Sequence, residues 1–119
     1  MKKTLVIGAS ENPMRVAYDA IRRLRRQGID VIAIGKRPGE IFGVPIQTGL
    51  LPLEGIHTVT LYINPSHQPE YYDYLIALKP QRIIFNPGTE NPELMQLARA
   101  NGIEVEVGCT LVMLSIGEY

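Results

Sequence analysis

The 119-residue sequence has little that would indicate a disulfide framework or a metal centre. Its single cysteine, Cys109, excludes a disulfide within the chain, and this scarcity is typical of proteins in a reducing compartment such as the cytoplasm. The two histidines, His57 and His67, are not at metal-ligand spacing, and no cysteine or acidic cluster lies beside them. We therefore predict a cytoplasmic protein without a metal site.

Net charge and long apolar runs are also lacking. The 12 Lys and Arg residues balance the 12 Asp and Glu residues, so the overall charge gives no indication of nucleic acid or an anionic membrane as a partner. No apolar run approaches the roughly 18–20 residues that a bilayer-spanning helix needs. We expect no nucleic-acid and no membrane partner, and any anion site must come from a local cluster of cations.

Short β-branched runs alternate with longer helical patterns along the chain. Strands are predicted at residues 4–8, 30–34, 58–63, 82–85 and 104–107, and helices at about 13–27, 66–78 and 92–101. Residues 36–55, rich in glycine and proline, are interpreted as a surface connection with a short strand or turn near residues 44–46. The pattern predicts an α/β fold for one domain, residues 1–119. It would be a Rossmann-like, doubly wound parallel sheet of about five strands with helices on both faces.

The dipeptide Asn-Pro occurs at residues 12–13, 64–65, 86–87 and 91–92. At 12–13 and 91–92 we predict helix starts, because Asn caps free N–H groups and Pro is favoured at the first helical position. The pairs at 64–65 and 86–87 directly follow predicted strands, where Pro ends the ladder. A parallel sheet binds ligands at this edge, so for these two pairs a functional and a purely structural role both stay open.

The loop after the first strand has the features of a phosphate-binding turn. It begins with three small residues, Gly8, Ala9 and Ser10. A ligand's phosphates could approach such a backbone closely, and a helix starting at Pro13 would direct its free N–H groups at them. Asn12 can donate or cap, and Arg15 can reach an anion at the loop. A tight strand–helix turn without a ligand would look much the same.

The residues after the second strand indicate which nucleotide such a site would take. A site for NAD usually has an acidic residue there, which accepts a hydrogen bond from the ribose 2′-OH. This chain has Lys36 and Arg37, which favour a phosphorylated ribose. Coenzyme A, with a 3′-phosphate, and NADP, with a 2′-phosphate, both satisfy the pattern. Two solvated loop cations are the structural alternative.

Four segments in this order, VIGASENPMR, VIAIGKRPGEIFGVPIQ, LYINPSHQ and GIEVEVGC, resemble the stand-alone coenzyme A-binding domain proteins. That family is similar to the nucleotide-binding domain of the succinyl-CoA synthetase alpha subunit. The resemblance extends over essentially the whole chain. The synthetase's phosphorylated histidine lies in a further domain that this chain does not contain, so its chemistry is not implied.

The resemblance implies a role for each part of the predicted edge. The diphosphate of coenzyme A would lie among Gly8, Ala9, Ser10 and Arg15. Lys36, together with Arg37, would meet the 3′-phosphate. Asn64 and Pro65 would lie beside the pantetheine arm, and Gly88 would be a glycine of close approach after the fourth strand.

No set of nucleophile, base and orienting residue is evident in the sequence. We interpret Cys109 as a small buried hydrophobe, since nothing near it in sequence would activate a thiol. The sequence thus favours non-catalytic binding of coenzyme A or a short acyl-CoA. The alternative is an enzyme, either an NADP-binding reductase or an acyl-CoA-handling catalyst. An enzyme this short would need a homodimer or larger oligomer to provide a substrate portion. A domain with a vestigial pocket is a third interpretation.

Overall fold

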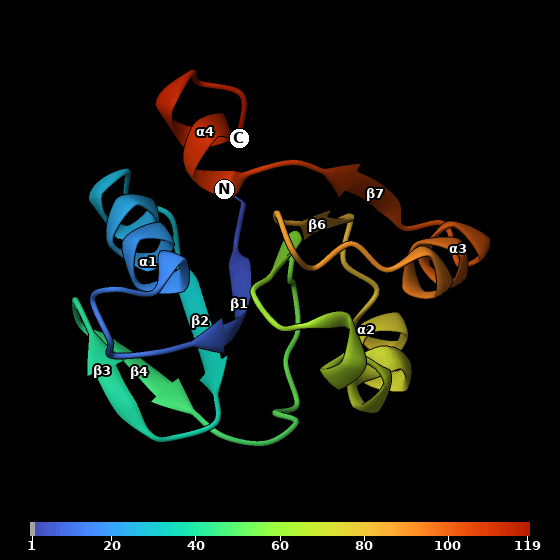
Figure 1. Ribbon diagram of the computed structural model, residues 1–119, viewed down its shortest axis with the longest axis horizontal. Helices are drawn as coiled ribbons and strands as arrows, with labels where there is room; N and C mark the ends of the chain where they lie inside the picture. Colours follow the sequence, from blue (N-terminus) through green and yellow to red (C-terminus); the bar gives the residue numbers. More distant parts are fainter. Residues whose placement is uncertain (1) are drawn as a thin grey trace.

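The computed structural model describes residues 2–119 and contains a seven-stranded sheet with helices on both sides (Figure 1). The strands are β1 (Thr4–Ala9), β2 (Val31–Gly35), β3 (Gly39–Ile41), β4 (Val44–Gln47), β5 (Thr58–Leu61), β6 (Arg82–Phe85) and β7 (Glu104–Val107). The helices are α1 (Val16–Arg26), α2 (Tyr72–Leu78), α3 (Pro92–Ala100) and α4 (Thr110–Ser115). Two 3₁₀ turns, η1 (Pro65–His67) and η2 (Pro69–Tyr71), precede α2.

The strand order is β3-β4-β2-β1-β5-β6-β7, and every pairing is parallel except that between β3 and β4. The α/β class is therefore confirmed. The expectation of about five strands in a fully parallel sheet is wrong. The two additional strands, β3 and β4, come from the segment interpreted as a surface connection, and β4 lies where a short strand or turn was expected.

A tight hairpin turns that segment into sheet. Phe42 and Gly43 both have positive φ, 48° and 80°, and two such residues in succession make the turn that best joins antiparallel strands. In β4 the side chains of Val44 and Ile46 are buried, whereas those of Pro45 and Gln47 are exposed. The alternating pattern VPIQ was thus a strand signal, and Pro45 is tolerated because β2 pairs with β4 only at Ile46 and Gln47.

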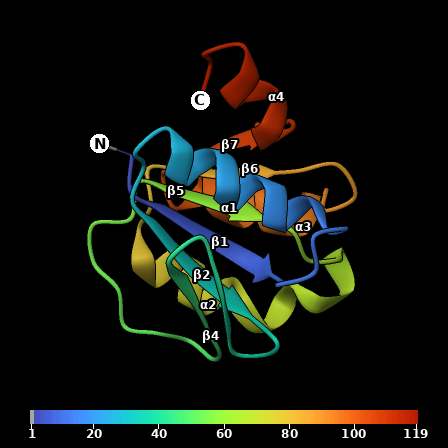
Figure 2. The ribbon, with the colours of Figure 1, turned by 90° about the vertical axis from the view of Figure 1, so that its left-hand side faces the viewer.

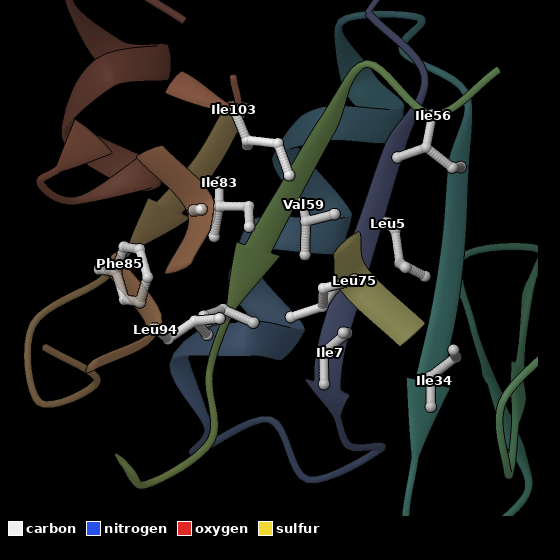
Figure 3. Close-up of a cluster of buried hydrophobic side chains, with 12 residues drawn as sticks. Leu5, Ile7, Ile34, Ile56, Val59, Leu75, Ile83, Phe85, Leu94 and Ile103 are labelled. Carbon is white, nitrogen blue, oxygen red and sulfur yellow. The ribbon is translucent and has the colours of Figure 1, made fainter. Parts of the chain in front are cut away.

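Successive residues of the central strands pack on opposite faces of the sheet. One core contains Leu5 and Ile7 of β1 and is covered by α2 and α3 through Leu75 and Leu94 (Figure 3). The other contains Val6 and is covered by α1 and α4, with the following buried residues: Ala17, Ile21, Leu24 and Leu114. Figures 1 and 2 show α1 on the opposite side of β1 from α2. Because both faces are covered, the central strands β1 and β5 are buried almost throughout, and most of their residues are apolar, as expected for parallel strands; Thr4, Thr58 and Thr60 are the buried polar residues among them.

Two helix starts differ from the expectation. α1 begins at Val16, not at Pro13: the side chain of Asn12 accepts a hydrogen bond of 3.0 Å from the Met14 N–H, and Arg15 is extended at the N-cap. Local bonding by Asn therefore competes with an earlier helix start. The expected helix over 66–78 is broken into η1, η2 and α2, because Pro69 has no N–H to continue the helical ladder.

The fold places four loops, those after β1, β2, β5 and β6, together at the carboxyl ends of the parallel strands. The chain runs from β1 outward to β2 on one side and returns to β5 on the other, so the connections diverge at the carboxyl end of β1. Ligands of such sheets bind in the crevice at this reversal point. Among the helices within residues 2–119, none has the length and hydropathy of a membrane-spanning segment.

Candidate ligand-binding cleft

A cleft of about 1160 Å³ opens at the carboxyl ends of β1, β2, β5 and β6. Nine of the ten residues predicted for the site line it: Gly8, Ala9, Ser10, Asn12, Arg15, Lys36, Arg37, Asn64 and Gly88. The tenth, Pro65, does not. A smaller pocket of about 250 Å³, around Gln27, Gly28 and Tyr119, lies near the opposite edge of the sheet and includes none of the predicted residues.

Gly8 is required by the packing of the cleft wall. Its φ is +99°, and a Cβ at this position would lie 2.8 Å from the carbonyl oxygen of Tyr62. The pairing of β1 with β2 also shifts register between Ile7 and Ala9. The sequence interpretation attributed the missing side chain to a ligand's approach. In the structure, the approach of the chain after β5 is sufficient reason for glycine.

The loop after β1 is closed by its own polar groups. Ser10 Oγ accepts a hydrogen bond of 3.1 Å from the Asn12 N–H, and the Asn12 carbonyl accepts one of 3.0 Å from the Arg15 N–H. The helix that follows begins at Val16, and both Val16 and Ala17 line the cleft. The first N–H groups of an α-helix have no partner within it, so the start of α1 offers donors and a positive dipole end to an anion.

Three cationic side chains converge on the cleft from two different loops. Arg15 comes from the loop after β1, and Lys36 and Arg37 follow β2. Within residues 2–119 the ion pairs are Arg22 with Asp19 and Arg82 with Glu106, so these three cations remain unpaired. Glu11 is the carboxylate among the lining residues. The neutral chain therefore carries a local excess of positive charge at this edge, as an anion site requires.

The residues after β5 and β6 have structural roles that the sequence did not reveal. The side-chain oxygen of Asn64 accepts a hydrogen bond of 2.9 Å from the Ser66 N–H and so caps η1, whose first residue is Pro65. Gly88 has a φ of +91° with open space where a Cβ would lie. It therefore serves a left-handed turn, and no tight packing in the structure requires it.

Asn86 ties three elements together beneath the cleft. Its side chain is 2% exposed, and Nδ2 donates to Thr60 Oγ1 at 2.6 Å and to the Leu61 carbonyl at 2.8 Å. Its Oδ1 accepts from the Thr110 N–H at 2.9 Å. For this Asn-Pro pair the sequence left function and structure open. The structure shows Asn86 joining β5, β6 and the start of α4.

The amide side chains of Gln68 and Asn91 join the loops after β5 and β6 to each other. The buried Gln68 donates from Nε2 to the carbonyls of Ile63 and Thr89, at 3.1 and 2.8 Å. Its Oε1 accepts from Asn91 Nδ2 at 2.9 Å. Asn91 also caps α3 through the Leu94 N–H, so the predicted cap is confirmed. This side of the cleft is consequently held by buried hydrogen bonds.

Three further residues with ionisable side chains line the cleft: Tyr62, His67 and Cys109. The Tyr62 hydroxyl is buried with no partner in hydrogen-bond geometry, and burial raises its pKa to about 12, against a smaller lowering by the nearby Thr110 and Thr60 hydroxyls. Tyr62 is therefore a neutral phenol at physiological pH. Cys109 is partly buried at the N-cap of α4. No group of three or more His, Cys, Asp or Glu suited to a metal occurs within residues 2–119.

The fold and the cleft together define an α/β domain with a cleft at the reversal point of its sheet, lined by Arg15, Lys36 and Arg37. A family model described as a CoA binding domain matches residues 2–115. The chain therefore belongs to the CoA-binding domain family, and the resemblance seen in the sequence is confirmed.

Solved structures agree with this assignment. The chain is 50% identical to an uncharacterized protein of known crystal structure, with a TM-score of 0.97, covering 100% of this chain and 98% of that one. A protein from Thermus thermophilus is 25% identical with a TM-score of 0.86, over 99% and 91% of the two chains.

Aspartate semialdehyde dehydrogenase II from Vibrio cholerae is 9% identical, with a TM-score of 0.55, over 98% of this chain and 45% of that one. At this identity the likeness shows a shared fold alone. No functionally curated protein matches the sequence.

Proposed function

We propose that residues 1–119 form one Rossmann-like binding unit that holds coenzyme A, or a short acyl-CoA, in this cleft without transforming it. The observation that carries the proposal is the convergence of Arg15, Lys36 and Arg37 on one cleft, unpaired within residues 2–119, in a chain of zero formal net charge. Membership of the CoA-binding domain family supports the choice of ligand.

The diphosphate is assigned to the start of α1. Ala9 and Ser10 keep this part of the cleft free of bulky side chains, and the N–H groups at Val16 and Ala17 supply donors. Arg15, extended at the N-cap, adds a full positive charge at the same place. Since Gly8 is already required by Tyr62, the proposal does not depend on that glycine contacting the ligand.

The 3′-phosphate is assigned to Lys36 and Arg37. Both side chains are exposed and follow the last residue of β2, where a site for NAD would carry an acidic residue. A doubly charged phosphate monoester forms charge-assisted hydrogen bonds with both cations. The pantetheine arm then extends past Asn64 and Gly88, along the side of the cleft that Gln68 and Asn91 brace.

Thermal and chemical unfolding in the presence of ligand tests the proposal. Coenzyme A at a hundred times its dissociation constant adds about 2.7 kcal/mol to the free energy of unfolding. At equal concentration, 3′-dephospho-coenzyme A stabilises less, and Lys36→Ala reduces the difference between the two ligands, because one of the two cations is lost. Arg26→Ala, an exposed cation at the other end of α1, serves as the matched control and leaves the difference intact. Equal stabilisation of the wild-type protein by both ligands overturns the assignment of Lys36 and Arg37.

The same cation pair supports a second candidate, an enzyme that binds NADP through its 2′-phosphate and acts as a homodimer or larger oligomer. It predicts stabilisation by NADPH exceeding that by coenzyme A, together with hydride transfer to a carbonyl compound. Absence of both effects, with stabilisation by coenzyme A, separates the binding module from this enzyme.

A further inference from the structure

Glu11 joins the loop after β1 to the strand β3. It belongs to the loop after β1, and its Oε2 accepts a hydrogen bond of 3.0 Å from the backbone N–H of Glu40, the middle residue of β3. A Cβ at the neighbouring Gly39 would lie 2.7 Å from Glu11 Cγ and closer still to Cδ. The glutamate side chain therefore lies directly on the backbone of β3, and only glycine at position 39 leaves room for it.

The cationic loop lies between the two ends that this contact holds. Lys36, Arg37 and Pro38 are the residues between the last residue of β2 and the first of β3. β3 is a three-residue edge strand whose sheet neighbour is β4. The ladder with β4 and the buried side chain of Ile41 hold the hairpin end of β3, and the contact from Glu11 adds a restraint at the end nearer to the loop.

The charge of Glu11 would by itself oppose an anionic ligand. It is the carboxylate among the residues that line the cleft, yet within residues 2–119 it forms no ion pair with Lys36, Arg37 or Arg15. Its charge is directed at a backbone N–H instead. The three cations stay available, and the presence of an acid beside the proposed phosphate sites has a structural reason.

We propose that Glu11 is a positioning residue: it latches β3 to the loop after β1, so that Lys36 and Arg37 lie at a set distance from the start of α1. The proposal rests on the function proposed above. A rigid arrangement lets one molecule place its diphosphate and its 3′-phosphate in both subsites without the cost of ordering a loop. Loss of the latch therefore affects the 3′-phosphate subsite most.

Three variants and two readouts test the latch. Glu11→Ala removes the acceptor, Glu11→Gln keeps an acceptor oxygen without the charge, and Gly39→Ala displaces the side chain. Amide hydrogen exchange at Glu40, followed by NMR, reports the latch without ligand, and calorimetric titration reports affinity for coenzyme A and for 3′-dephospho-coenzyme A.

Glu11→Ala is expected to speed exchange at the Glu40 amide by about tenfold and to weaken coenzyme A binding by about tenfold, because loss of the charge-assisted hydrogen bond outweighs removal of a like charge. Its affinity for 3′-dephospho-coenzyme A changes by less than about twofold, as this ligand does not use Lys36 and Arg37. Glu11→Gln retains slow exchange and binds coenzyme A as tightly as the wild-type protein or more tightly, since a like charge is removed. Gly39→Ala reproduces Glu11→Ala, and the double variant is no weaker than either single one.

The possible failures are distinguishable. If the wild-type protein binds coenzyme A, and Glu11→Ala binds coenzyme A and 3′-dephospho-coenzyme A each as tightly as the wild-type protein does, the latch is wrong and the proposed function stands. The latch is also wrong, with the proposed function intact, if Glu11→Gln is as weak as Glu11→Ala. If the wild-type protein binds no coenzyme A, the proposed function and the positioning role fall together, whatever the exchange rate. Gly39→Ala provides the test should Glu11→Ala fail to fold.

Discussion

The side-chain oxygen of Asn86 lies 2.9 Å from the backbone nitrogen of Thr110 and accepts its hydrogen bond, 24 residues along the chain. This bond joins the end of β6 to the first residue of α4, beneath the cleft. The Thr60 and Thr110 hydroxyls, 2.9 Å apart, complete a buried polar group that also includes Asn86 Nδ2. The cleft floor is thus held by hydrogen bonds and not by apolar packing alone.

Asn86→Ala should destabilise the protein strongly. It leaves the Thr110 N–H and the Leu61 carbonyl without their buried partner, and each such loss costs about 1–3 kcal/mol. We expect the free energy of unfolding, measured in urea, to fall by about 2–4 kcal/mol. Asn101→Ala removes an exposed side-chain bond to the Leu97 carbonyl and is the matched control, with a change below about 1 kcal/mol. Equal effects for the two variants would contradict the role of Asn86.

Gly8→Ala and Gly88→Ala form a pair that separates packing from backbone strain. Both glycines have similar positive φ, +99° and +91°, but a Cβ at Gly8 meets the Tyr62 carbonyl oxygen at 2.8 Å, whereas at Gly88 nothing lies within 4 Å. Strain alone costs about 1–2 kcal/mol at either position. Gly8→Ala should therefore lower the free energy of unfolding by about 2 kcal/mol more than Gly88→Ala, since the clash adds an overpacking cost.

Denaturation in urea at neutral pH measures this difference between the two glycine variants. Equal losses of stability would mean that the chain after β5 yields easily, and that the close approach of Gly8 to Tyr62 does not explain the glycine. Retention of full stability in Gly8→Ala would remove the packing explanation altogether.

From the buried Tyr62 hydroxyl we expect a loss of stability at alkaline pH and little effect on stability at pH 7 when Tyr62 is replaced by Phe. Burial raises the pKa of Tyr62 to about 12 from 10.0, so the folded protein keeps this proton when the unfolded chain loses it. The stabilisation is complete below pH 10 and is lost as pH rises from 10 to about 12, by at most about 2.7 kcal/mol. Tyr62→Phe should reduce that loss. It should leave stability at pH 7 unchanged or slightly higher, because the buried hydroxyl has no partner.

Urea unfolding of the wild-type protein and Tyr62→Phe at pH 7, 9 and 11 measures both effects. Tyr62→Phe should still lose some stability at alkaline pH, since burial also raises the pKa of Tyr119. Identical pH profiles for the two proteins, or a clear loss of stability in Tyr62→Phe at pH 7, would contradict the prediction. The second outcome would mean that the hydroxyl has a hydrogen-bond partner in solution.

The local sequence pattern predicted the correct bounds for those elements in which all the signals indicate the same structure. The strands predicted at 82–85 and 104–107 coincide with β6 and β7, and the predicted helix at 92–101 ends within one residue of α3. In these segments apolar runs, a capping Asn91 and a Pro at the first helical position all agree. The loops after the strands could likewise be placed at one edge of the sheet, because parallel strands align their carboxyl ends.

The prediction failed where one residue could serve two structures. Asn12 closes a turn on Met14 and so delays α1, and Pro69 divides a stretch whose apolar spacing suits a continuous helix. A short strand or turn was expected near residues 44–46, where β4 lies, but its antiparallel partner β3 was not predicted, because the glycines and prolines of this segment are usual in loops. Pro65 begins η1 and does not line the cleft, so its expected place beside a ligand stays a prediction.

By itself the sequence determined the class of fold, the edge at which a ligand is expected and the cations that reach it, since these follow from periodicity, chain order and charge. Only the tertiary structure decided why particular residues stand where they do. Gly8 accommodates Tyr62, Asn86 joins two strands to α4, and Glu11 crosses to β3. These contacts join residues 24 to 54 positions apart, and no local pattern encodes which distant backbone group a side chain will meet.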